Sequence, residues 1–204
     1  MIGVGPPHRE AVGLDDVGTA LLFDRSCGHC GVCQLGWSAW CEQPGEGRAL
    51  CSIPKQVSVS FATAVLMATS ALMTADLDGS AIVAVCTPPG HEVLSRLAQL
   101  VHRGPIVATS DLRDPQFKSY LGETSATGRP DAIVTVSSGR DAVMAVKRGG
   151  IVCLAESIDD MPSVTELAQR EVRVLGPRDL SAVVDGIGRR QVEEAFGFAH
   201  RTPQ

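Results

Sequence analysis

Four cysteines within fifteen residues constrain this chain more than any other feature of its sequence. The segment CGHCGVCQLGWSAWC contains Cys27, Cys30, Cys33 and Cys41, and only three more cysteines occur among the 204 residues. The total of seven is odd, which suits thiolate ligands better than a full set of disulfide bridges. In a reducing compartment, cysteines spaced this closely favour a bound metal ion.

The spacing C-x2-C-x2-C-x7-C is typical of a four-sulfur metal site. Each C-x-x-C turn places two sulfurs on one side of a tight loop, and Gly28, Gly31 and Gly36 suit such a backbone. Zn²⁺ takes four thiolates at roughly 2.3 Å in closed structural sites. We therefore predict a structural zinc site. Free or disulfide-paired cysteines, and iron in the same cage, are the alternatives.

This spacing, introduced by LLFDRSCGHC, resembles the structural zinc lobe of the medium-chain (zinc-type) alcohol dehydrogenases. The resemblance implies that the four cysteines are the lobe ligands. It also implies that the lobe interrupts a catalytic domain, and that a nucleotide-binding Rossmann domain follows it.

Composition excludes several classes of function. Eighteen Lys and Arg residues against 23 Asp and Glu give a net charge of −5, and no basic stripe is present, so nucleic acid is not expected as a partner. The N-terminus lacks the pattern of a secretory signal, and the most apolar stretch, 61–77, is too interrupted to span a membrane. We expect a cytoplasmic protein.

Downstream of the lobe, apolar strand-like runs alternate with amphipathic helical segments, which predicts a parallel, doubly wound α/β sheet. The expected strands are 80–86, 105–111, 131–138, 150–156 and the run EVRVLG, and the expected helices are 59–77, 90–103, 114–123, 139–150, the segment after residue 162 and the stretch 179–198. A further strand, 18–24, leads into the lobe, and 42–55 reads as a turn-rich connection.

The order of these elements resembles a trimmed Rossmann domain, and the resemblance covers about residues 18–176. The family has one more strand and helix where TSATGRP stands here. We expect two domains. Residues 1–55 form a remnant of the catalytic domain with the zinc lobe, and residues 56–204 form the Rossmann-like domain.

The catalytic zinc ligands that the resemblance implies are not found at the matching positions. No cysteine occurs among the 26 residues before Cys27, and His8 is the only histidine there. Aligning the helix before the first Rossmann strand on Thr69 places Val65 at the third ligand position, and valine cannot bind zinc.

The dinucleotide loop is altered as well. A G-x-G-x-x-G loop lets the backbone approach a pyrophosphate, but AVCTPPGHEV places Cys86, Pro88 and His91 at its glycine positions. Proline lacks an N–H and has a fixed φ, so we do not expect bound NAD(P). Asp111 matches the acidic residue that would hold a ribose, and a helix N-cap is its alternative role.

The carboxyl ends of the strands form a candidate replacement site, since open parallel sheets bind ligands there. Cys86, His91 and Glu92 could act as a nucleophile, a base and a carboxylate, or the set could hold a second metal ion. Asp111, Ser137, Ser138, Cys153 and Glu156 also fall at strand ends. The alternative is that Cys86 and Cys153 are small core residues and that His91 and Glu92 form a first helical turn.

Three functions remain open from the sequence. The chain could be an accessory or binding protein, a repurposed catalyst of a small-molecule pathway, or an NAD(P)-dependent oxidoreductase completed by a partner subunit. Trp37 and Trp40 could mark an interface. The resemblance implies a homodimer through the last Rossmann strand, here EVRVLG, and pairing with a partner enzyme is the other possibility.

Overall fold

The computed structural model describes residues 9–14, 18–34, 41, 43–88, 92–155, 162–177 and 179–197. The chain divides into two compact units, one of residues 1–66 with 178–204 and one of residues 67–177. The C-terminal segment therefore returns to the N-terminal unit. The expected partition into domains 1–55 and 56–204 stays a prediction, because compactness alone does not reveal which segments share an origin.

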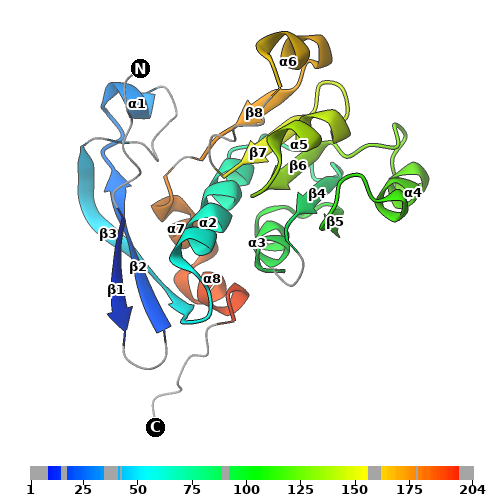
Figure 1. Cartoon of the computed structure of the whole chain (residues 1–204). Helices are drawn as coiled ribbons and strands as arrows, with labels where there is room; N and C mark the ends of the chain where they lie inside the picture. The colour runs from blue at the N-terminus through cyan, green and yellow to red at the C-terminus, as the bar shows by residue number, and fades with distance from the viewer. Residues whose placement is uncertain are drawn as a thin grey trace. The chain divides into compact units, whose positions relative to one another are not determined.

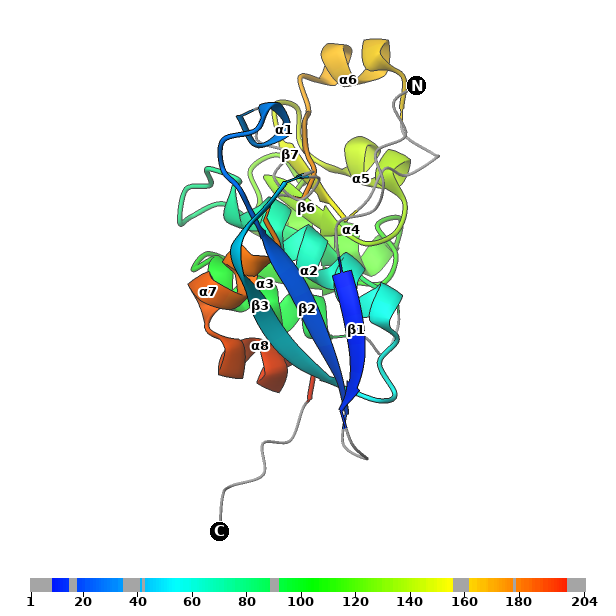
Figure 2. The same cartoon turned by 90° about the vertical axis from the view of Figure 1, so that its left-hand side faces the viewer.

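The first unit is built on an antiparallel three-stranded sheet. Its strands are β1 (Arg9–Leu14), β2 (Gly18–Ser26) and β3 (Pro44–Pro54), in that order across the sheet. Figure 2 shows β2 between its two neighbours. Leu21 pairs with Cys51, and Thr19 pairs with Ile53. The expected strand at 18–24 is confirmed, and β2 continues to the residue before Cys27.

The expectation of a turn-rich connection over 42–55 is wrong, because Pro44–Pro54 forms an eleven-residue strand. Glycines and charges at its start read as a loop, but the run from Ala49 to Ile53 pairs with β2. Gly45 lies where an added Cβ would come within 2.6 Å of the Ser26 carbonyl oxygen. A glycine is therefore what allows β3 to run close beside the end of β2.

Two helices of the C-terminal segment complete this unit. α7 (Ser181–Ile187) and α8 (Arg189–Ala195) both pack against β3, and they appear in orange and red in Figure 1. They were expected as one helical stretch. Gly188 separates them because its φ is +99°, which a helix interior does not allow.

One long helix, α2 (Val59–Met73), carries the boundary between the two units. Apolar and small residues occupy most of its positions, and the eight consecutive residues from Val65 to Leu72 are all buried. A helix that is apolar on all sides is stable only when it is covered on all sides. No helix in the described ranges is long and apolar enough to cross a membrane.

The second unit contains the predicted parallel sheet, so the α/β fold is confirmed. Its five strands are β4 (Val83–Cys86), β5 (Ile106–Thr109), β6 (Ala132–Thr135), β7 (Ile151–Leu154) and β8 (Arg173–Leu175). The order across the sheet is β5-β4-β6-β7-β8, with every pair parallel. All residues of β4, β6 and β7 are buried, as expected for central strands covered on both faces.

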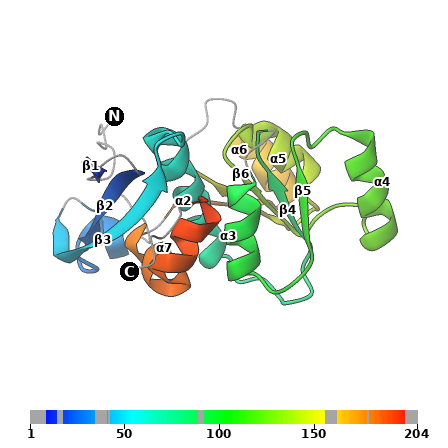
Figure 3. The same ribbon diagram turned by 90° about the horizontal axis from the view of Figure 1, so that it is seen from below.

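The helices cover both faces of this sheet. They are α3 (Val93–Val101), α4 (Pro115–Thr124), α5 (Gly139–Ala145) and α6 (Val164–Arg170). The chain moves outward from β4 to β5 and then back across β4 to β6. Since such crossovers are right-handed, α3 and α4 must lie on opposite faces. Figure 3 shows them on opposite sides of β4 and β5.

The face under α4 and α5 forms one apolar core. Phe117 and Leu121 of α4 and Val143 of α5 pack there on Ala84 and Ile133 of the sheet. Asp114 caps α4 by accepting a hydrogen bond from the Gln116 N–H at 2.8 Å, with Pro115 at the first helical position.

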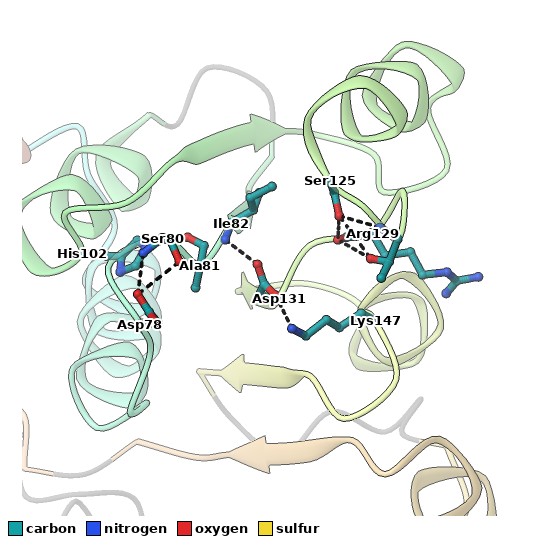
Figure 4. Close-up of polar contacts among 10 residues, drawn as sticks. Asp78, Ser80, Ala81, Ile82, His102, Ser125, Arg129, Asp131 and Lys147 are labelled. Atoms are coloured by element: carbon teal, nitrogen blue, oxygen red, sulfur yellow. Dashed lines mark hydrogen bonds and ion pairs between the residues drawn. The ribbon is translucent and has the colours of Figure 1, made fainter.

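Asp131 fixes the amino ends of the central strands (Figure 4). Its carboxylate accepts a hydrogen bond from the Ile82 N–H at 2.6 Å and pairs with Lys147. On the same edge, the His102 ring lies 2.8 Å from the Ala81 carbonyl oxygen. These contacts hold the start of β4 against the residues that precede β5, β6 and β7.

Candidate metal centre and strand-end crevice

The cysteine lobe, residues 27–41, begins directly where β2 ends. Gly28 has a φ of +75°, so the chain reverses at a conformation that glycine adopts without strain. The short helix α1 (Gly31–Gln34) follows, and the Gln34 N–H donates to the Cys30 carbonyl at 2.9 Å. This turn brings Cys33 back toward Cys27. Residues 35–40, with Trp37 and Trp40, lie outside the described residues.

The four sulfurs converge as the spacing predicts. Cys41 Sγ lies 3.5 Å from Cys27 Sγ and 3.8 Å from Cys30 Sγ, and Cys27 Sγ lies 4.0 Å from Cys33 Sγ. All four sulfurs lie within 4.8 Å of one another. Zinc–sulfur bonds of roughly 2.3 Å place tetrahedral sulfurs about 3.8 Å apart. The donor set therefore fits a four-coordinate ion such as Zn²⁺ or iron.

Disulfide pairing does not describe this cluster. A disulfide needs sulfurs about 2.05 Å apart, and the sulfur separations here are far longer. No disulfide joins any of the seven cysteines. The cluster thus has the geometry of a ligand set rather than of a covalent cross-link.

Backbone N–H groups point at the sulfurs. The Cys30 N–H donates to Cys27 Sγ at 3.3 Å, and the Cys27 N–H donates to Cys41 Sγ at 3.4 Å. Desolvation opposes ionisation of Cys27, but N–H donors of His29 and Cys30 outweigh it and lower its pKa to about 6. Desolvation and the neighbouring Cys41 raise the pKa of Cys33 to about 12. Crowded thiols ionise one at a time, and a cation in their midst would favour all four thiolates.

The residues before the lobe are held by the C-terminal segment of the same unit. Asp179 accepts hydrogen bonds from the Ser26 N–H at 3.1 Å and from the Ser26 hydroxyl at 2.7 Å. The Arg25 guanidinium makes two hydrogen bonds to the Asp185 carboxylate, at 2.5 and 3.0 Å. The lobe therefore starts from a fixed strand end.

At the carboxyl ends of the parallel strands, Cys86 lies beside polar groups of β6 and the loop after it. Its Sγ is 3.7 Å from the Ser137 hydroxyl, which is 2.9 Å from Thr135 Oγ1. Burial raises the pKa of the Cys86 thiol, and the negative charges of Asp111 and Asp141 act in the same direction, against hydrogen bonds from Ser137 and Thr135. This environment favours the neutral thiol, which is a poor nucleophile.

Among the predicted crevice residues, Ser137 contacts Cys86, and Glu92 does not join them in the described part of the chain. His91 and Glu156 lie outside the described residues. Glu92 is exposed and pairs with Arg96 at 3.5 Å, one turn along α3. Its role as a catalytic group, with Cys86 and His91, stays a prediction.

Asp111 follows β5 at the position predicted for a ribose contact. Its Oδ1 accepts a hydrogen bond from the Arg113 N–H at 2.8 Å, so the carboxylate caps a turn of its own loop. The N-cap of α4 is Asp114 and not Asp111. The alternative prediction that Asp111 is a helix N-cap is therefore wrong. Its carboxylate accepts a hydrogen bond from a backbone N–H of its own loop instead.

Two further cysteines serve the cores. Cys51 on β3 and Cys153 on β7 are completely buried, and burial raises the pKa of each thiol to about 12. Ser138 is the N-cap of α5 and accepts a hydrogen bond from the Asp141 N–H at 3.1 Å. Cys51 and Cys153 therefore pack in the cores, and Ser138 caps a helix. Of the three buried thiols, only Cys86 has polar neighbours at a strand end.

The sequence did not single out Thr135, which contacts Ser137, nor Asp179, which contacts Ser26. A hydroxyl at a strand end and a carboxylate two residues before a serine are common in loops. Only the fold shows which partner, 153 residues away for Asp179, such a group meets.

The comparisons with known proteins bear on the fold. No protein-family model matches the sequence, and no curated protein matches it. Among solved structures, the chain is similar to the alcohol dehydrogenase TADH from Thermus sp. ATN1, with a TM-score of 0.53 and 15% identity. That match covers 96% of this chain and 75% of the dehydrogenase chain.

Two other solved structures match this chain with TM-scores below 0.5. A thermostable alcohol dehydrogenase from Pyrobaculum aerophilum gives a TM-score of 0.49 and 17% identity, covering 91% of this chain and 67% of that one. The AibC structure gives 0.47 and 16%, covering 91% of this chain and 63% of that one. The chain spans only part of these proteins, and at such identities the likeness to TADH shows the fold alone.

Proposed function

We propose that this chain is a zinc-binding relative of the medium-chain alcohol dehydrogenases that acts as an accessory or binding protein in a small-molecule pathway. The observation that carries the proposal is the convergence of four sulfurs at the spacing of a tetrahedral ion. The dehydrogenase-like fold, shared with TADH, supports the origin of the scaffold.

In this proposal the zinc ion is structural. Cys27, Cys30, Cys33 and Cys41 fill all four positions of a tetrahedral site, so no position is left for water or substrate. A closed thiolate site contributes to folding and does not polarise a substrate. The ion would fix the lobe on the end of β2, which Asp179 holds through Ser26.

The contacts around the predicted cofactor loop favour an accessory role over hydride transfer. Cys86 and Pro88 replace glycines that a pyrophosphate needs, and Asp111 is engaged by the Arg113 N–H. Because burial favours the neutral thiol of Cys86, this residue is poorly suited to act as a nucleophile in a repurposed enzyme. NAD(P)-dependent catalysis completed by a partner subunit is the competing function.

Calorimetry of the purified chain with NADH and NADPH separates these two functions. The accessory role predicts no binding at cofactor concentrations up to about 1 mM, the upper end of the usual range of KM values. Micromolar binding of either cofactor, lost in an Asp111→Ala variant, would instead establish the competing function. A homodimer through β8 is part of the proposal. Sedimentation velocity of the same samples should show that this dimer persists without cofactor.

A further inference from the structure

A pocket of about 330 Å³ lies between α4 and α5, on the face of the parallel sheet that these helices cover. Leu112, Phe117 and Leu121 form its apolar floor, and each of them is at most 6% exposed. A pocket of this volume with a buried apolar floor is within the range that accepts a small organic molecule.

Cationic side chains surround this floor. Arg113, Lys118 and Arg129 line the pocket together with a single carboxylate, that of Asp141. Three positive charges against one negative charge leave an excess of two positive charges, in a chain whose net charge is −5. The local charge therefore opposes the charge of the whole protein, which favours an anionic ligand.

The Asp141 carboxylate neutralises only one of the three cations, Arg113. Asp141 pairs with Arg113 at 2.5 Å. The Lys118 ammonium has no ion pair or hydrogen bond within the described part of the chain. An exposed lysine at the mouth of an apolar pocket provides three N–H donors for a ligand. Its ammonium group is the cation most available to an anionic head.

Arg129 is held in place by its own loop and by α5. Its Nη1 donates to the Met144 carbonyl at 2.6 Å, and the Ser125 hydroxyl donates to the Arg129 carbonyl at 2.8 Å. Gly128, with a φ of +63°, makes the turn before it. Figure 4 shows the Arg129 side chain extending away from Asp131. A fixed guanidinium binds an anion at a lower entropic cost than a mobile one.

The pocket runs along α4 and α5, with Arg113 and Asp141 toward the carboxyl ends of the strands and Arg129 toward their amino ends. Leu121 ends the buried face of α4, and Arg129 lies on the loop that leads to the amino end of β6. Cys86 and Ser137 lie at the opposite, carboxyl end of the same strands. Lys118 and Arg129 are therefore not part of the dinucleotide loop, and the binding of a ligand by these two cations does not rest on the proposed function.

We propose that this pocket binds a small organic anion with an apolar ring or chain, of the class of aryl and aliphatic carboxylates. The apolar body covers Phe117 and Leu121, and the carboxylate head accepts hydrogen bonds from Lys118 and Arg129. Charge-assisted hydrogen bonds of this kind are stronger than neutral ones, so the charge of the head decides the affinity.

Calorimetry of the full chain with 1-naphthaleneacetate and its neutral amide, 1-naphthaleneacetamide, tests this proposal. The two probes have the same ring and nearly the same size, so their difference isolates the charge. We expect the acid to bind at least about tenfold more tightly than the amide, as a charged hydrogen bond implies. Equal affinities, or no binding of the acid, would overturn the proposal.

Variants locate the site. Lys118→Glu should remove the preference for the acid, whereas Arg103→Glu, the same change of charge beyond α3, should retain it. Ala145→Leu, which narrows the pocket, should weaken both probes to a similar extent. Circular dichroism verifies that each variant is folded. An unchanged preference in Lys118→Glu, or its loss in Arg103→Glu, contradicts binding at this pocket.

Discussion

The Glu193 carboxylate accepts a hydrogen bond at 2.8 Å from the backbone N–H of Ser52, 141 residues earlier in the chain. Glu193 is only 2% exposed, and its second contact is Arg189 Nε at 2.8 Å. A buried carboxylate on α8 thus completes the hydrogen bonding of β3. The C-terminal helices are therefore part of the N-terminal unit and not an appendage of the parallel sheet.

Replacing Glu193 with Ala should destabilise this unit. The change leaves the buried Ser52 N–H without an acceptor, which costs about 2 kcal/mol in the free energy of unfolding. Urea denaturation followed by circular dichroism measures this loss. Glu194→Ala is the matched control, because Glu194 pairs with Arg190 on the exposed side of α8 and should change stability by less than about 0.5 kcal/mol. Equal effects of the two variants would contradict the structural role of Glu193.

Asp179 should contribute stability that depends on pH. Burial opposes its ionisation, but hydrogen bonds from Ser181 and Ser26 outweigh burial and lower its pKa in the folded chain. A lowered folded pKa stabilises the fold fully above the unfolded value of about 4, and this contribution is lost as pH falls through the folded pKa. Asp179→Ala should therefore be less stable than the wild type by about 2 kcal/mol at pH 7.

The pH dependence distinguishes this effect from simple loss of packing. The difference in unfolding free energy between the wild type and Asp179→Ala should shrink as pH falls below about 4. A difference that stays constant from pH 7 to pH 3 argues against the hydrogen-bonded carboxylate as its source. Because Ser26 precedes Cys27, the same variant should also release zinc faster to a chromogenic chelator.

Asp131 should stabilise the parallel sheet through one hydrogen bond and one ion pair. Asp131→Ala removes the acceptor of the Ile82 N–H and leaves Lys147 without its partner, which we expect to cost about 2 kcal/mol. Asp78→Ala is the control, because Asp78 only caps an exposed turn at Ser80. Hydrogen exchange of the β4 amides provides the readout. Equal protection of the β4 amides from exchange in both variants would contradict this role of Asp131.

The seven thiols should divide into two classes by reactivity. Cys51, Cys86 and Cys153 are buried and should resist iodoacetamide in the folded protein. The four lobe cysteines should be protected while metal is bound and should react after a chelator removes it. Mass spectrometry counts the added groups. Four modified thiols in the metal-loaded chain, or none after chelation, would be inconsistent with a four-thiolate site.

The parallel sheet could be predicted because its central strands are continuous apolar runs between glycine and proline signals. Runs such as those of β4 and β7 are buried on both faces, and nothing in their sequence competes with a strand. β3 could not be predicted in the same way. Its first residues resemble a turn, and the strand is specified by its pairing with β2.

The convergence of the four lobe cysteines could be predicted because their spacing is local. Four sulfurs within fifteen residues can meet through turns alone, and no distant part of the chain is needed. Glu193 shows the opposite case. Arg189 lies four residues earlier, which reads as an exposed helical ion pair, and only the packing of α8 on β3 buries the carboxylate.

Metal analysis of the purified chain, combined with cobalt substitution, tests the central claim most directly. We predict one zinc ion per chain by mass spectrometry of the intact protein, and a Co²⁺ form with the visible absorption of a tetrahedral thiolate site. A double variant, Cys30→Ser with Cys41→Ser, should bind neither ion, whereas Cys86→Ser should bind both like the wild type. A chain that is free of metal, or whose lobe cysteines are joined as disulfides, would contradict the account.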